Sequence, residues 1–218
     1  MIKLLLYDLD GTLIDSRLDI AHAVNWTLNE LGLRPLSVDL VSAFVGNGVK
    51  NLMQQALKAA SPSSLPPLGR SIKLFRRRYG EHLLDETRLY PSVKKVLEFF
   101  KNTSQAVVTN KPEDFTREIL QGLGIDSYFG RVIGGEQGFP KKPAPEPVLE
   151  LLQHFEVRSE EAILIGDSRT DVETARNAGI QSAAVTYGFG KRPELEAAQP
   201  DILLNDLEEL TRCPLLKK

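Results

Sequence analysis

The amino-acid sequence predicts an α/β fold with a parallel sheet at its core and a helical domain inserted after the first strand. Short apolar runs, each typical of a strand buried on both faces, occur at 2–8, 105–109, 131–133, 162–165 and 182–186. Helical patterns lie between them, at 92–101, 113–123, 145–155 and 169–178. Strands that alternate with helices at this spacing are typical of βαβ units, and therefore of a parallel sheet.

The stretch between the first two predicted strands is too long for a simple crossover. A βαβ unit needs roughly 30 residues, whereas about 100 residues separate Asp8 from Gln105. Apolar residues at helical spacing predict helices over 18–31, 37–44 and 49–57, and a fourth from the Ser/Pro-rich linker 61–67 to about residue 84. Ser37 is a plausible N-cap. We therefore expect a helical domain at 16–87 and an α/β core made of 1–15 and 88–218.

The composition excludes several classes of protein. The 218 residues carry a net charge of −2, which argues against a basic nucleic-acid binder. No apolar run approaches the roughly 18 residues of a membrane-spanning helix, so we expect a cytoplasmic protein with no membrane partner. The lone Cys213 forms no internal disulfide, and three scattered histidines make no zinc site.

Polar residues follow the first apolar run. Asp8 and Asp10 are two residues apart, so in an extended segment both carboxylates face one side, and Gly11 permits a sharp exit from the strand. Ligands of open α/β sheets bind at the carboxyl ends of the strands, where these residues would lie. Taken alone, the pattern is equally consistent with a surface Asp-x-Asp-Gly turn.

Three further groups of polar residues lie at later strand and helix ends. They are Thr109 and Asn110 after the second apolar run, Lys142 before a helix, and Asp167 with Asp171 after the fourth run. Each group has an ordinary structural explanation: a turn, a solvated cation, and carboxylates that favour a helix N-terminus. The complete set in this order favours a functional site.

Together these segments resemble the haloacid dehalogenase-like hydrolase superfamily. The resemblance rests on Asp-Leu-Asp-Gly-Thr-Leu at 8–13, Thr-Asn at 109–110, Lys-Pro at 142–143 and Gly-Asp-Ser-Arg-Thr-Asp at 166–171. It implies a Rossmann-like core, with the helical insert corresponding to the superfamily's small cap domain. Local similarity at 18–20, 45–48, 142–147 and 185–188 is greatest to bacterial phosphoglycolate phosphatases.

The resemblance also implies roles for individual residues. Asp8 would be the nucleophile that forms an aspartyl-phosphate, and Asp10 the general acid and base. Mg²⁺ would be held by Asp8, the Asp10 backbone carbonyl and Asp167, with Asp171 on the metal or its waters. The phosphoryl oxygens would be held by Thr109, Lys142, Asn110 and backbone amides near Gly11. Dehalogenase members lack an acid at the position of Asp10, so its presence favours phosphate transfer.

The resulting expectation is a Mg²⁺-dependent phosphatase for a small phosphorylated metabolite, with 2-phosphoglycolate as the leading substrate. Gly46 and Asn47 lie on a segment that faces the active site in relatives, and we expect their neighbours to select the substrate. A pyrophosphate, sugar phosphate or nucleotide monophosphate substrate stays open, as does a β-phosphoglucomutase-type transferase. A phospho-receiver module and a non-catalytic binder of a phosphorylated ligand rank lower. The sequence leaves both a monomer and a homodimer open.

The charge is divided unevenly along the chain. Residues 17–88 contain 10 Lys/Arg and 6 Asp/Glu, so this segment is basic and the remainder is acidic. The run Arg76–Arg78 is most simply a solvated helix face, with anion steering as the alternative. A basic insert over an acidic core suits an anionic substrate handled between the two.

Overall fold

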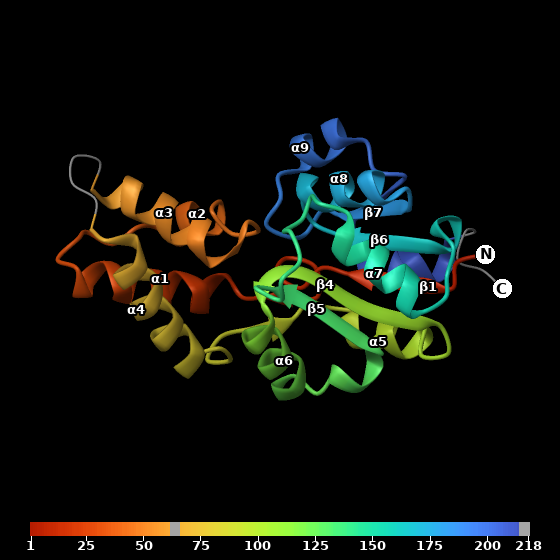
Figure 1. Ribbon diagram of the computed structural model, residues 1–218, viewed down its shortest axis with the longest axis horizontal. Coiled ribbons are helices and arrows are strands. Elements are labelled where there is room, and N and C mark those ends of the chain that lie inside the picture. Colours follow the sequence, from red (N-terminus) through yellow and green to blue (C-terminus); the bar gives the residue numbers. More distant parts are fainter. Residues whose placement is uncertain (62–65, 214–218) are drawn as a thin grey trace.

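A six-stranded parallel sheet forms the core of the computed structural model, which describes residues 1–61 and 66–213 (Figure 1). The strand order is β5-β4-β1-β6-β7-β8, and every neighbouring pair is parallel. The strands are β1 (Leu4–Tyr7), β4 (Ser104–Pro112), β5 (Arg131–Gly135), β6 (Ala162–Gly166), β7 (Gln181–Val185) and β8 (Ile202–Leu204). The predicted α/β fold is therefore confirmed.

Helices cover both faces of this sheet. Packed on one face are α5 (Val93–Phe99), α6 (Glu113–Gly122) and the 3₁₀ helix η3 (Leu207–Arg212). On the other are α7 (Glu146–His154) and α8 (Arg169–Ala178), with α9 (Arg192–Ala198) packed beside α8 against β7. Along β1, Leu5 and Tyr7 join one hydrophobic cluster while Leu4 and Leu6 join the other. This two-sided burial explains why β1 is apolar at every position.

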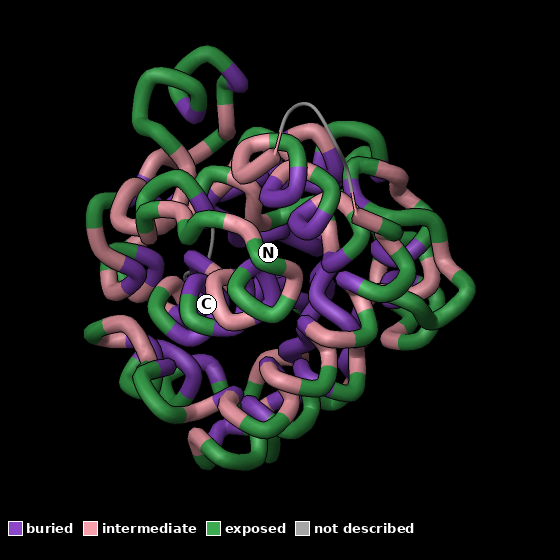
Figure 2. The backbone as a smooth tube through the Cα atoms, turned by 90° about the vertical axis from the view of Figure 1, so that its left-hand side faces the viewer, coloured by how far each residue is buried: buried purple, intermediate pink, exposed green. Residues whose placement is uncertain are grey.

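Four helices form a separate group at one end of the sheet, which we call the helical insert (Figure 1). They are α1 (Arg17–Glu30), α2 (Val38–Ser42), α3 (Gly48–Ala60) and α4 (Leu68–Glu81). Buried stretches of the backbone lie mostly toward the interior of the molecule, and exposed stretches lie mostly at its outside (Figure 2). Part of the predicted 61–67 linker, residues 62–65, lies outside the described residues.

The chain enters and leaves the insert through two paired segments. The strands β2 (Ile14–Asp15) and β3 (Arg88–Leu89) are antiparallel. Beside them the buried Asp19 carboxylate accepts hydrogen bonds from the backbone N–H groups of Glu86 and Thr87 and from the Thr87 hydroxyl, at 2.7–3.0 Å. The Asp19 carboxylate at the start of the insert thus binds the segment by which the chain returns from the insert to the core.

Several element boundaries differ from the sequence prediction. The strand β4 continues to Pro112 rather than ending at 109, with a register shift against β5 between Val108 and Pro112. The helix α4 ends at Glu81 rather than near residue 84. The Ser37 hydroxyl does accept from the Leu40 N–H and caps α2 as expected. The remaining 3₁₀ helices are η1 (Asp126–Tyr128) and η2 (Ser159–Glu161). Within the described ranges, no helix is long and apolar enough to cross a membrane.

Candidate active site

The turn after β1 places Asp8 at the carboxyl edge of the sheet. Its backbone N–H continues the sheet by donating to the Ile165 carbonyl at 2.9 Å, and the residue is 7% exposed. Gly11 follows with a φ of +83°, in the left-handed region that glycine adopts readily. A Cβ at Gly11 would collide with the Asp167 carboxylate. The glycine therefore allows the turn to approach the neighbouring strand end.

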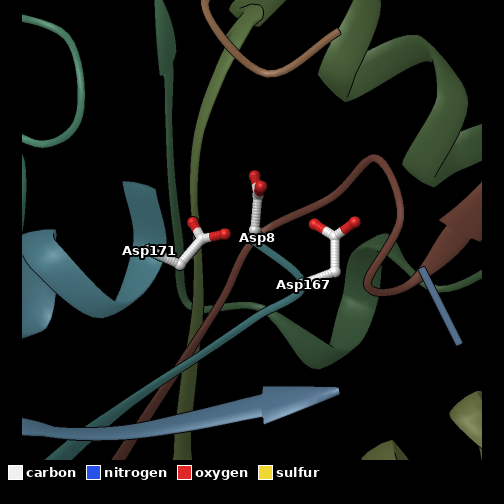
Figure 3. A group of neighbouring side chains, drawn as sticks. All are labelled: Asp8, Asp167 and Asp171. Atoms are coloured by element: carbon white, nitrogen blue, oxygen red, sulfur yellow. The ribbon is translucent and has the colours of Figure 1, made fainter. Parts of the chain in front are cut away.

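Three buried carboxylates meet at this edge. Asp8 follows β1, Asp167 follows β6, and Asp171 lies in the first turn of α8; one oxygen of each lies within 4.8 Å of the others. Their side chains face a common space, with Asp8 between the other two (Figure 3). The sequence predicted this convergence, because parallel strands end at the same edge of a sheet.

Burial and mutual repulsion change the acidity of this cluster. Burial is the largest cause that raises the pKa of Asp8, to about 6, and the charge of Lys142 partly opposes it. The pKa of Asp167 is raised well above its usual range by burial and by the charges of Asp171 and Asp8. Carboxylates arranged in this way favour a bound cation, because a positive charge would offset both effects.

The donor set suits a hard divalent ion. Mg²⁺ prefers oxygen ligands from one or two carboxylates, with waters and phosphate completing its shell. The Asp8 Oδ1 atom is buried and has no hydrogen-bond partner of suitable geometry among the described residues. Asp167 binds the N–H groups of Phe189 and Gly190 through Oδ2 alone. The Asp167 Oδ1 atom therefore has no hydrogen-bond partner among the described residues, whereas Asp8 Oδ1 has the Lys142 ammonium 3.0 Å away.

Lys142 offsets part of the negative charge of the cluster. Its ammonium lies 3.0 Å from Asp8 Oδ1 and 2.6 Å from Asp171 Oδ1, and it donates to the Val108 carbonyl at 3.1 Å. The other oxygen of Asp171 accepts from the N–H and hydroxyl of Ser168. Lys142 is 4% exposed, so the solvated-cation explanation is wrong for it. Asp171 is both a helix-start carboxylate and a member of the cluster.

The hydrogen-bond partners of Asp10 differ from those of the three clustered carboxylates. Its carboxylate accepts from Lys111 Nζ at 2.9 and 3.1 Å and from the Ser16 hydroxyl at 2.6 Å. The sequence reasoning missed Lys111, whose side chain is buried in this ion pair. Thr109 and Lys111 are two residues apart on β4, so strand periodicity would have placed them on one side, had the strand been extended past 109.

Asn110 is engaged by protein rather than free for phosphate. Its amide N–H₂ donates to the Gly46 and Lys142 carbonyls, at 2.9 and 3.1 Å, and its Oδ1 accepts from the Lys142 N–H. Both N–H groups of this amide thus have protein acceptors, and its expected contact with a phosphoryl oxygen stays a prediction. The Asn47 carbonyl similarly accepts from Lys141 at 3.2 Å. The loop at Gly46 and Asn47 is therefore bound to the core site, as its predicted position requires.

Two cavities flank Asp8 and Asp10. The inner cavity lies between the insert and the core and includes Gly46, Thr109 and Lys111 in its lining. The outer cavity is lined in part by Gly46, Asp167, Ser168 and Lys191. A ligand that contacts Asp8 and Asp10 can therefore extend under the insert.

Fold and site together define a hydrolase family. The family model described as haloacid dehalogenase-like hydrolase matches residues 5–185, and the chain belongs to this family. It is an enzyme of the phosphatase type.

Among relatives, the chain is similar to the phosphoglycolate phosphatases of Aquifex aeolicus and Vibrio parahaemolyticus. Identity is 35% over 212 residues with the first and 36% over 215 with the second, covering 96% of this chain and 95% and 94% of theirs. A crystal structure of a predicted phosphoglycolate phosphatase from Haemophilus somnus superposes with a TM-score of 0.93 at 33% identity, covering 97% of both chains.

Proposed function

We propose that this enzyme hydrolyses a small phosphate monoester, 2-phosphoglycolate, to glycolate and phosphate with the help of Mg²⁺. The observation that carries the proposal is the buried Asp8 carboxylate, ion-paired with Lys142 and grouped with Asp167 and Asp171. The names of the full-length relatives support the substrate.

Asp8 is the nucleophile in this proposal. A carboxylate oxygen of Asp8 attacks phosphorus and forms an aspartyl-phosphate, while the bond between phosphorus and the ester oxygen breaks. Asp10, which lines the same cavity, donates a proton to the departing alkoxide. Water then attacks phosphorus, its proton passes to Asp10, and the bond from phosphorus to Asp8 breaks to release phosphate.

Lys142 and Thr109 hold the phosphoryl oxygens. The Lys142 ammonium is fixed by Asp171 and by the Val108 carbonyl, so little reorganisation is needed when charge develops. Asp8, Asp167 and Asp171 would hold Mg²⁺, with the Asp10 carbonyl as the further ligand that the family resemblance implies. When bound, the metal offsets the repulsion between an anionic ester and these carboxylates.

The helical insert, assigned to 16–87, acts as a cap over the site. Its Gly46 loop is hydrogen-bonded to Asn110, and its apolar residues enclose the inner cavity. Enclosure excludes water from the leaving group and limits substrate size. Separation of the insert from the core would open the cavity to solvent.

Phosphate release from 2-phosphoglycolate tests this proposal directly. The wild-type protein should release phosphate with Mg²⁺ and stop when EDTA is in excess. Asp8→Asn should show neither turnover nor an acid-stable phosphoenzyme, whereas Asp10→Asn should mainly slow turnover. Asp126→Asn, on the exposed face of η1, is the matched control and should retain full activity.

Two results would contradict parts of the proposal. Unchanged steady-state rates in Asp8→Asn would refute the covalent mechanism. Full activity in excess EDTA would refute the role of Mg²⁺ in the reaction. An isomerised sugar phosphate formed without net phosphate release would favour the β-phosphoglucomutase-type transferase instead. Release from pyrophosphate or sugar phosphates but not from 2-phosphoglycolate would leave the class intact and change the substrate.

A further inference from the structure

The inner cavity is mainly apolar and carries one cation in its lining. Ile20, Val49, Leu52, Phe75 and Phe115 supply apolar surface. Of the charged lining residues in the described part of the chain, two are Asp8 and Asp10 and the third is Lys111. The phosphoryl chemistry already described uses Lys142, which is absent from this lining, and gives Lys111 no role.

Lys111 is held at the cavity wall by two polar partners. Its ammonium donates to both oxygens of Asp10, at 2.9 and 3.1 Å, and to the Tyr79 hydroxyl at 2.7 Å. Burial, the largest effect, would lower the pKa of Lys111, but the charge of Asp10 together with the hydrogen bonds to Asp10 and the interactions with Tyr79 raises it. The side chain therefore stays charged although it is 4% exposed.

Tyr79 adds a second donor beside Lys111. Its oxygen accepts from the ammonium, and no acceptor for its own hydrogen is found among the described residues. Burial raises the pKa of Tyr79 to about 12, so the phenol keeps that hydrogen near neutral pH. Stacking on Phe75 and an edge contact with Phe115, both at 5.3 Å between ring centroids, fix the ring. The cavity wall thus presents an ammonium and a hydroxyl donor from adjacent side chains.

We propose that Lys111 and Tyr79 together bind a carboxylate on the leaving group, so that the enzyme selects phosphate esters of small hydroxy acids. This inference rests on the proposed function, because it assigns the part of the substrate that remains after phosphate leaves. A carboxylate can accept from both donors, and a charged hydrogen bond is strong in an enclosed apolar setting.

The charges of the cavity favour a single carboxylate over a second phosphate. Lys111 is the one cationic side chain among the described residues that line this cavity, so a dianion at the leaving-group end would have a single positive charge to offset it. An uncharged leaving group would leave the Tyr79 hydrogen unpaired, which is unfavourable in a buried site. A monoanion avoids both penalties.

A matched pair of substrates isolates this contact. Ethyl phosphate has the same two-carbon leaving group as 2-phosphoglycolate, with a methyl group in place of the carboxylate. The measured quantity is the ratio of kcat/KM for 2-phosphoglycolate to kcat/KM for ethyl phosphate. A general effect of a variant on the chemical steps, including one that acts through Asp10, lowers both values and cancels in this ratio.

Lys111→Met should lower the ratio at least about tenfold, and Tyr79→Phe about threefold to tenfold, mainly through KM for 2-phosphoglycolate. Lys95→Met, in an ion pair with Glu208, and Tyr128→Phe, bonded to Glu98, are the controls and should leave the ratio unchanged. Tyr79→Phe keeps the Lys111–Asp10 pair and serves as the test if Lys111→Met fails to fold.

The outcomes separate this inference from the proposed function. If the ratio in both variants, or in Tyr79→Phe alone when Lys111→Met does not fold, stays within about twofold of wild type, Lys111 serves Asp10 only and the inference is overturned. If wild type cleaves both esters with equal efficiency, the carboxylate is not recognised, yet the phosphatase assignment stands. If wild type cleaves neither ester under any metal condition, the proposed function itself fails.

Discussion

Asp8→Asn should stabilise the metal-free protein against unfolding at neutral pH while it abolishes turnover. In the folded state burial raises the pKa of Asp8 from 3.8 to about 6, so the folded protein holds this proton more tightly than the unfolded chain does. The wild-type protein therefore loses stability as pH rises from about 4 through 6, and the loss is complete above that range. The asparagine side chain does not ionise, so the variant does not lose stability in this pH range.

The size of this effect follows from the two pKa values. Their difference corresponds to about 3 kcal/mol at pH 7.5 and above, since each pH unit is worth about 1.4 kcal/mol. For a chain of 218 residues that is a difference in Tm of roughly 6–12 °C. At pH 4.5 the difference should have fallen to about 1 kcal/mol, because the unfolded chain is by then partly protonated and the protonated acid resembles the amide.

Urea unfolding in EDTA at a series of pH values between 4.5 and 8 measures this difference. The gap in unfolding free energy between variant and wild type should widen as pH rises. Asp126→Asn should run parallel to wild type, because Asp126 is exposed. Adding Mg²⁺ should then stabilise wild type more than Asp8→Asn, since an amide is the poorer ligand. Parallel profiles for Asp8→Asn and wild type across the whole pH series would refute the reasoning that burial controls this carboxyl.

Three further substitutions test the parts that hold the site together. Gly11→Ala should destabilise by about 1–3 kcal/mol and raise the Mg²⁺ concentration needed for phosphate release, because its Cβ would displace Asp167. Asp19→Asn should destabilise by about 1.5–3 kcal/mol in urea unfolding, because the charged acceptor of the Glu86 and Thr87 N–H groups is lost. Arg76→Ala should change stability by less than about 1 kcal/mol yet speed amide hydrogen exchange in α4, because Arg76 links the insert to Asp114 and Glu136 of the core at 2.6 and 2.8 Å.

Each of these substitutions has a control of the same chemical type. Gly32 also has a positive φ, +69°, but an added Cβ would have open space around it. Gly32→Ala should therefore show the backbone strain without raising the Mg²⁺ concentration needed for phosphate release. Asp39→Asn is exposed on α2 and should leave stability nearly unchanged. Arg70→Ala, exposed on the same helix as Arg76, should leave exchange in α4 as in wild type. Equal effects in variant and control would contradict the corresponding explanation.

The carboxylate cluster of the site could be predicted from the sequence because two of its residues directly follow predicted strands. Asp8 and Asp167 follow short, wholly apolar strands, and a parallel sheet brings such ends together whatever the connections between them. The elements β2 and β3 were not predicted, because two-residue strands have no periodicity to detect. Their pairing depends on how the insert closes, which is a property of the whole fold.

The charge pattern of the sequence led to a less accurate expectation. A basic insert was expected to attract an anionic substrate, yet the insert residues that line the inner cavity carry no charge, and its cation comes from β4 of the core. Of the arginine run, Arg76 pairs with core carboxylates, and Arg77 and Arg78 lie over the Trp26 ring, at 5.4 and 5.9 Å from its centroid. Net charge summed along a segment does not say which side chains reach a buried cavity.

Three consecutive residues of β4 contact three different parts of the site: Asp8, the Gly46 loop of the insert, and Asp10. Thr109 and Lys111 both line the inner cavity, the first next to Asp8 and the second bonded to Asp10. Asn110 between them binds the Gly46 loop and the Lys142 backbone. Because Thr109 and Lys111 share one strand, the backbone of β4 sets the spacing between the proposed phosphoryl contact and the Lys111 part of the proposed carboxylate contact, and Tyr79 joins that contact from α4. Substitutions elsewhere in the insert that keep the cavity closed should therefore alter KM for all esters alike, whereas those at Lys111 and at Tyr79, the residue of α4 bonded to it, should alter the preference for an acid.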